Sequence, residues 1–343
     1  MTSLTHEGAQ APRFSPSDVA RRLFIRFGIL PWLLLTVVVF FGLQEPRFLS
    51  EVNLLNVARQ STFLMIVAMA QLLVLITAGM DLSVGAMIGL VGVIAASVMK
   101  SLVGEGMDVS AAIALGMLAG LGASVLVGAF NGFCVAVLRL SPFIATLGTM
   151  TALTGIALTL SNGVPVSGFP QAYLMFFSVT DVLGMKPPIL ATIVVFILGY
   201  VLLHHTTTGR YMYAIGSNER AARLSGISTT RVVFTAYILC SLITGVAALL
   251  VLARIGTGGA GIGADYGLQS VTACVIAGVS LFGGTGKIGN VVLGALFLAL
   301  LSNGMNIMQV QSYAQMVVLG AILVLALVGD RLRMRLLGQR AGH

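Results

Sequence analysis

Nine stretches of 18 to 42 consecutive residues carry no charged side chain, and together they make up most of this 343-residue chain. Charged residues are 9% of the sequence, against about 25% in soluble domains. A helix needs roughly 20 apolar residues to cross a bilayer, and unpaired backbone groups cannot face lipid. The stretches lack the two-residue alternation of barrel strands. The sequence therefore predicts an all-α, polytopic membrane protein.

We expect about ten transmembrane helices. The two longest uncharged stretches, 140–180 and 288–329, can each hold two helices, or one helix with a re-entrant piece. The predicted spans lie near residues 24–43, 58–78, 83–102, 110–138, 142–160, 188–205, 231–253, 268–283, 288–303 and 313–329. Residues 1–23 and 331–343 are then expected to be cytoplasmic tails, and 24–330 the transmembrane domain with a cytoplasmic loop at 206–230.

The basic residues predict the orientation. With ten spans both termini lie on one side, and that side collects 14 of the 19 Lys and Arg residues. Cytoplasmic loops carry the excess of Lys and Arg, so both termini are expected in the cytoplasm. The net charge of +8 is thus a topology signal rather than a sign of nucleic-acid binding.

A weak internal repeat links the two halves of the chain. Asn131-Gly132 and Asn303-Gly304 each precede a predicted span by a similar distance, and Gly79-Met80-Asp81 has a counterpart in Gly263-Ala264-Asp265. Spans two to five would then match spans seven to ten with opposite direction. Inverted repeats recur in transporters, with the substrate path at their interface.

Asp81 is the most informative polar residue, because uncharged stretches of 21 and 18 residues flank it. An acidic residue within the membrane is a functional-site hypothesis by default. The alternative is a polar turn residue that caps the next helix, and one side chain can do both. Aromatic Phe143 could stack on a face of the transported solute or simply pack. The residues predicted to line a substrate path are Asp81, Ser83, Asn131, Phe143, Thr146, Asn303 and Asn306.

The 206–230 loop is predicted to contain a short, basic, amphipathic helix. Ser217 or Asn218 can cap its start, Glu219 suits its first turn, and Gly226 can end it. A capped helix between two spans indicates a docking element for a partner. The residues predicted to couple the chain to that partner are Ser217, Asn218, Glu219, Arg220, Ala221, Ala222, Arg223 and Gly226.

Four segments, in order and at fitting spacing, resemble the permease subunits of ribose-type sugar ATP-binding-cassette importers: Asn53–Val57, Gly79–Gly85, Pro142–Thr149 and 208–227. The resemblance runs from about residue 24 to 330. It implies a bacterial inner-membrane permease that works as a pair, with two cytoplasmic ATP-binding-cassette subunits and a periplasmic solute-binding protein. It also implies that 216–227 is the coupling helix, although an arginine stands after Glu219 where the family signature has none.

The chain itself is not expected to be an enzyme or to hold a cofactor or metal. Gly283–Lys287 looks like a phosphate loop, but Leu281 and Ile288 occupy positions where that motif needs Gly and Ser or Thr. ATP is expected in the partner subunit. Two alternatives stay open: a secondary transporter that uses Asp81 to couple protons, and a permease of the same kind for another solute, such as a branched-chain amino acid or a furanose.

Overall fold

The structure is a computed structural model that describes residues 30–336, and these residues form helices joined by short loops. They contain no β-strand beyond two isolated bridges. The helical elements in chain order are α2 (Leu30–Gln44), η1 (Pro46–Leu49), α3 (Glu51–Ile76), α4 (Val84–Gly104), α5 (Val109–Gly132), the π-helical turn η2 (Phe133–Val137), α6 (Pro142–Leu160), α7 (Gln171–Ser178), α8 (Pro187–His205), α9 (Thr207–Ser217), α10 (Glu219–Leu224), α11 (Thr229–Ile255), α12 (Tyr266–Ile276), α13 (Ile288–Ile307) and α14 (Ser312–Leu336).

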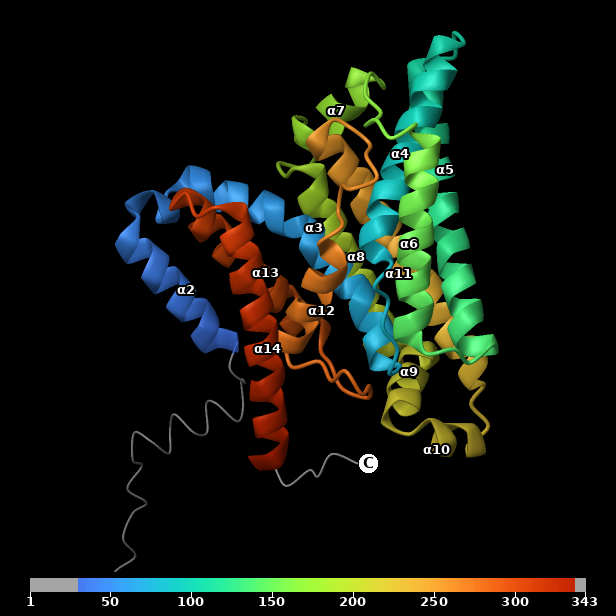
Figure 1. Cartoon of the computed structure of the whole chain (residues 1–343), viewed down its shortest axis with the longest axis vertical. Helices are drawn as coiled ribbons and strands as arrows, with labels where there is room; N and C mark the ends of the chain where they lie inside the picture. The colour runs from blue at the N-terminus through green and yellow to red at the C-terminus, as the bar shows by residue number, and fades with distance from the viewer. Residues whose placement is uncertain (1–29, 337–343) are drawn as a thin grey trace, which may run out of the picture.

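Helices α3 and α11 form the centre of the bundle. α11 packs on α3, α4 and α5, while α3 also contacts α8, α12 and α13. From Ser61 to Ile76 nearly every residue of α3 is buried, so this helix is apolar all round, as a helix enclosed by others must be. Figure 1 shows α3 crossing the molecule obliquely behind α12 and α13.

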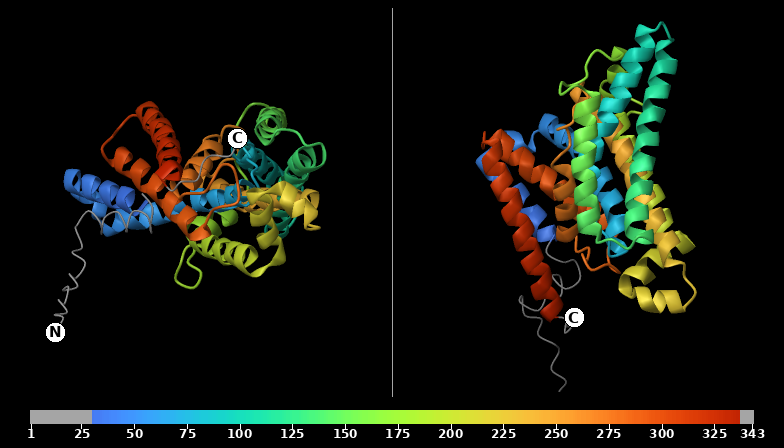
Figure 2. Two further views of the ribbon diagram at one scale, coloured as in Figure 1. Left: turned by 90° about the horizontal axis from the view of Figure 1, so that it is seen from below. Right: turned by 45° about the vertical axis from the view of Figure 1, so that its right-hand side comes forward.

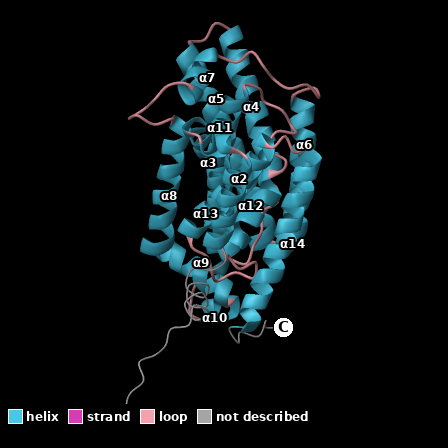
Figure 3. Ribbon diagram, turned by 90° about the vertical axis from the view of Figure 1, so that its left-hand side faces the viewer, coloured by secondary structure: helices cyan, strands magenta, loops and turns pink. Residues whose placement is uncertain are grey.

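Different short helices and turns lie at the two ends of the helical bundle. α9 and α10 lie at the lower end in Figure 1, where the described part of α14 also finishes. α7 and the turn between α4 and α5 lie at the opposite, upper end, and the rotated views agree (Figures 2 and 3). The predicted tail 1–23 lies outside the described residues. Residues 331–336 continue α14 rather than starting the predicted tail.

Nine of the ten predicted spans coincide with helices. Among residues 30–336, seven helices are long and apolar enough to cross a membrane, and α2, α12 and part of α14 are shorter apolar helices. The total of ten crossings and the inverted repeat stay predictions.

The prediction of a full helix over 268–283 is wrong. α12 has 11 residues, which at about 1.5 Å per residue is roughly half the thickness of a bilayer core. A non-helical stretch, 256–265, precedes it and runs antiparallel to α4, with a bridge at Gly258 and consecutive turns from 260 to 265. Gly258 lies against Gly92, and a Cβ on Gly89 would lie 2.6 Å from the Ala260 carbonyl oxygen. Non-helical backbone at membrane depth is tolerated where protein covers it, and the glycine face of α4 provides that cover.

Glycines of α4 and α5 make two different kinds of close contact. Glycines spaced four apart suggest close helix packing, and Gly116 and Gly120 of α5 do face side chains of α4. Gly85 and Gly89 instead face the backbone of the non-helical stretch 256–265, since a Cβ on Gly85 would lie 2.6 Å from the Ala264 carbonyl oxygen. Each needs to be glycine because backbone, not a movable side chain, lies against it.

Candidate functional site

The turn between α3 and α4 (residues 77–83) lies beside α9 and places Asp81 between the helices, where the residue is fully buried. Its Oδ1 accepts hydrogen bonds from the backbone N–H of Ser83 (2.9 Å) and from the Ser83 hydroxyl (2.6 Å). Ser83 is the residue that precedes the first turn of α4. The carboxylate therefore holds the residue that precedes α4, while α4 has no side-chain capping bond at its own first turn.

Two further helices contribute to this buried polar cluster. Asn131 of α5 donates to the Ser83 hydroxyl at 2.8 Å and to the Asp81 carboxylate at 3.3 Å. Thr149 of α6 donates to the Asn131 side-chain oxygen at 2.7 Å. Thr146, one turn earlier, accepts from the backbone N–H of Leu82 at 3.2 Å. Four of the predicted path residues, Asp81, Ser83, Asn131 and Thr146, thus meet in one place.

The backbone on either side of the carboxylate is also held. Gln71 of α3 lies beside Asp81, and in the amide orientation that satisfies both groups it donates to the Asp81 carbonyl (3.0 Å) and accepts from the Asp81 N–H (3.2 Å). The Tyr237 hydroxyl of α11 donates to the Met80 carbonyl at 3.1 Å. The cluster therefore ties one turn to α3, α5, α6 and α11.

Sequence reasoning missed Thr149, Gln71 and Tyr237 as members of the cluster. Thr149 follows Thr146 at a spacing that puts both on one helix face, and Gln71 is an isolated amide within an uncharged stretch. Both patterns could have been recognised in the sequence. Nothing in the sequence points to Tyr237, because its partner is a backbone carbonyl 157 residues away.

The other predicted path residues lie elsewhere. Asn303 of α13 exchanges two hydrogen bonds of 2.9 Å with Asn53 of α3. Asn306 accepts a hydrogen bond from Gln315 of α14 at 2.8 Å. Phe143 is 52% exposed on α6. These residues do not gather with Asp81, and their place in a path stays a prediction.

The predicted docking helix is present as α10. Asn218 caps it by accepting from the Ala221 N–H at 2.9 Å, and Glu219 pairs with Arg223 one turn on. Gly226 follows with a φ of +83°, a conformation that favours glycine. Ser217 does not cap α10. It is the last residue of α9, where its hydroxyl donates to the Tyr213 carbonyl.

Helix α9 was not predicted, and it connects α10 to the membrane domain. Gly216 packs directly on the Ile76 carbonyl at the end of α3, which also accepts from the Gly284 N–H at 2.9 Å. The Tyr213 hydroxyl donates to the Gly286 carbonyl at 2.6 Å. Burial raises the pKa of Tyr213 above its ordinary value, so the hydroxyl keeps the proton that makes this bond.

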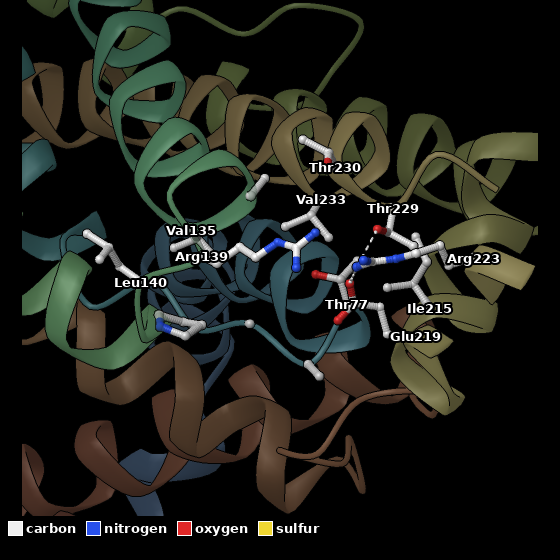
Figure 4. Close-up of a pocket in the computed structure, with 14 residues that line it drawn as sticks. Thr77, Val135, Arg139, Leu140, Ile215, Glu219, Arg223, Thr229, Thr230 and Val233 are labelled. Atoms are coloured by element: carbon white, nitrogen blue, oxygen red, sulfur yellow. Dashed lines mark hydrogen bonds and ion pairs between the residues drawn. The ribbon is translucent and has the colours of Figure 1, made fainter. Parts of the chain in front are cut away.

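A cavity of about 320 Å³ lies between α10 and the turn that carries Asp81 (Figure 4). Its walls come from the α3–α4 turn, the η2–α6 loop, α9, α10 and the start of α11. The residues that line it are Thr77, Ala78, Gly79, Val135, Ala136, Arg139, Leu140, Pro142, Ile215, Glu219, Arg223, Thr229, Thr230 and Val233.

A bundle of long apolar helices with one short, interrupted helix and a fully buried polar cluster is typical of a multi-pass membrane transport protein. The comparisons agree with this class. Residues 53–327 match the family described as branched-chain amino acid transport system/permease component, and the chain belongs to this family.

Curated relatives cover most of the chain. It is 37% identical to the ribose import permease protein RbsC of Escherichia coli (strain K12), over 87% of this chain and 91% of that protein. It is 33% identical to the D-allose transport system permease protein AlsC (90% and 92%) and to the L-arabinose transport system permease protein AraH (98% of both), from the same organism. No solved structure matches the chain.

Proposed function

We propose that the chain is the transmembrane permease subunit of an ATP-binding-cassette importer that carries a monosaccharide. The observation that carries the proposal is its similarity to import permeases for ribose, allose and arabinose over nearly the whole chain. The capped helix α10, at one end of the bundle, supports it because such an importer needs a surface on which its ATPase acts.

The remaining parts follow from this role. The permease lies in the bacterial inner membrane with both termini and α9–α10 in the cytoplasm, as the 14-to-5 distribution of basic residues supports. Two ATP-binding-cassette subunits bind ATP below it, a second permease completes the path, and a periplasmic solute-binding protein delivers the sugar. The chain needs no cofactor of its own.

The contacts give a route from α10 to the membrane domain. Motion of α10 passes to α9, whose Gly216 packs on the end of α3, and the loop glycine Gly283 packs on Ala78 beside it. The next residues of the same turn enter the Asp81 cluster, which bonds to α5 and α6. A pull on α10 therefore acts where four helices are tied together. ATP binding must favour one of two arrangements of these helices, or no transport results.

Transport in reconstituted vesicles tests the proposal. The permease, its two ATPase subunits and the binding protein are reconstituted with ATP in the lumen, and uptake of ribose, allose and arabinose is measured. We expect uptake that requires ATP and survives collapse of the proton gradient. Glu219→Arg, which places like charges one turn apart on α10, should leave ATP hydrolysis intact and abolish uptake.

The competing functions give different results in the same vesicles. Uptake without ATP that stops when the proton gradient collapses would replace the proposal with a secondary transporter. The family description names branched-chain amino acids, so leucine belongs in the panel. ATP-driven leucine uptake with no sugar uptake would support an ATP-driven importer but refute a sugar as its substrate.

A further inference from the structure

The cavity beside α10 has the size and charge of a ligand site. Its volume of about 320 Å³ falls in the range of about 300–1,000 Å³ that small-molecule sites occupy. Arg139 and Arg223 enter it from opposite sides, one from the η2–α6 loop and one from α10 (Figure 4). We call this cavity the arginine pocket.

The arginine pocket carries an excess positive charge. Glu219 is the one acidic residue in its lining, and this carboxylate is paired with Arg223. Within residues 30–336, Arg139 has no ion-pair or hydrogen-bond partner for its guanidinium group. A guanidinium that points into a cavity with no protein partner is available to a ligand.

The backbone at Arg139 strengthens this assignment. Arg139 has a φ of +56°, a left-handed conformation that glycine or asparagine adopts at lower cost. The next residue, Leu140, donates its N–H to the Cys134 carbonyl at 3.0 Å, which closes the turn after η2. The turn alone would be better served by glycine, so the arginine side chain is the reason to examine this position for function.

The rest of the lining favours an ester over a bare ion. The Thr229 hydroxyl accepts from Arg223 and can still donate its own proton to an oxygen, and Val135, Leu140 and Val233 provide an apolar wall. Guanidinium groups match the oxygens of a phosphoryl group with paired hydrogen bonds. Further basic residues at the same end, which raise the local anion concentration, are Arg210, Arg220, Arg231 and Lys287.

We propose that the arginine pocket binds the phosphoryl group of a phosphate ester at the α10 end of the molecule, with Arg139 as its main ligand. The ester is either a small cytosolic molecule, such as a phosphorylated sugar, or the headgroup of an anionic lipid. The occupant touches α10, the α3–α4 turn and the start of α11 together. It therefore holds α10 against the membrane domain and slows any step that moves α10.

Binding is measured directly, without transport. The chain is placed in phosphatidylcholine nanodiscs and titrated with ribose 5-phosphate, inorganic phosphate and ribose by calorimetry. We expect saturable binding of ribose 5-phosphate, weaker binding of phosphate and none of ribose. In parallel, native mass spectrometry of the chain from mixed-lipid nanodiscs detects retained phosphatidylglycerol. Retention of this lipid without binding of the soluble ester would assign the site to a headgroup.

Three variants make the test specific. Arg139→Gly removes the guanidinium and suits the positive φ, so the fold is kept and ligand binding should fall at least tenfold, as expected when a hydrogen bond to a charged group is lost. Arg139→Lys keeps the charge but not the paired hydrogen bonds, and should bind with intermediate affinity. Arg254→Gln removes a charge from the last turn of α11, at the opposite end of the molecule and outside the pocket lining, and should bind like the wild type. No binding of either ester, or equal binding by the wild type and Arg139→Gly, would overturn the site.

The inhibitory effect rests on the proposed function and is tested apart from binding. Ribose 5-phosphate sealed with ATP inside transport vesicles should slow sugar uptake by the wild type and leave Arg139→Gly unaffected. Binding without inhibition would keep the site and overturn its effect on α10. Failure of sugar uptake itself would instead overturn the proposed function, because the nanodisc titration needs neither ATP nor a sugar gradient.

Discussion

Replacing Asp81 separates a structural carboxylate from one that carries protons. Asp81→Leu removes the acceptor of two donors, the Ser83 N–H and the Ser83 hydroxyl, inside a fully buried site. Asp81→Asn keeps one side-chain oxygen in the same position. Its new amide group faces Asn131, another donor, at the position of the oxygen now 3.3 Å away.

The loss of folding stability in each variant follows from the hydrogen bonds that it removes. A buried donor left without a partner costs about 1–3 kcal/mol, so Leu should lose about 2–6 kcal/mol from the two Ser83 donors. The substitution also removes the desolvation cost of the buried carboxylate. We therefore expect a loss of stability at the lower end of that range, about 2–3 kcal/mol. This exceeds the roughly 1 kcal/mol that an exposed helix cap contributes, and it is a large share of a typical stability of 5–15 kcal/mol. Asn should lose about 1 kcal/mol or less.

Thermal unfolding of the purified proteins measures the order of stability among the wild type, Asp81→Asn and Asp81→Leu. Uptake per inserted molecule measures their transport. We expect the midpoint to fall by several degrees in Asp81→Leu and little in Asp81→Asn. Asp265→Leu is the control, because Asp265 precedes α12 without a side-chain capping bond, and it should melt near the wild type. An unchanged midpoint in Asp81→Leu would refute the structural role. Uptake lost equally in Asn and Leu would refute it in favour of proton coupling, because neither side chain titrates.

Three further outcomes are expected. External labelling of single cysteines in intact cells should modify position 171 and spare position 220; labelling of position 220 would reverse the orientation. Gly226→Pro cannot adopt the φ of +83° and should uncouple ATP hydrolysis from uptake in vesicles. Gly226→Ala keeps the N–H and should retain most coupling. Full transport by the proline variant would refute the coupling role. Gly85→Ala should lower the unfolding midpoint, because its Cβ would lie 2.6 Å from a carbonyl oxygen, whereas Gly104→Ala meets nothing within 4 Å; equal midpoints would contradict the packing.

The helices could be predicted because hydropathy alone decides which segments enter lipid. α10 was also predictable, since Asn218, Glu219 and Gly226 act on their own neighbours in sequence. Asp81 stood out because a charge is costly in such a stretch. These signals are local, and the physical rule behind each needs only a few adjacent residues.

The rest depends on distant contacts. The stretch 256–265 is glycine-rich and apolar enough to be either a loop or part of a helix. Only its contact with the glycine face of α4 shows why it stays non-helical. Asn303 and Asn306 were grouped with Asp81 because all are polar within spans. Polarity does not reveal the partner, and each of the two asparagines has a partner of its own.

The contact between α4 and 256–265 also limits how the protein can move. Backbone lies directly on backbone at Gly85, Gly89 and Gly258, with no side chains between that could change rotamer and let the segments slide. These two parts of the chain, one from each half, must therefore travel as a single rigid body during a transport cycle. Relative motion has to take place along boundaries filled by side chains, such as those of α6, α8 and α14. Cross-links between residues that flank the glycine contact, with the glycines kept, should leave transport intact, while cross-links from α6 to the rest of the bundle should stop it.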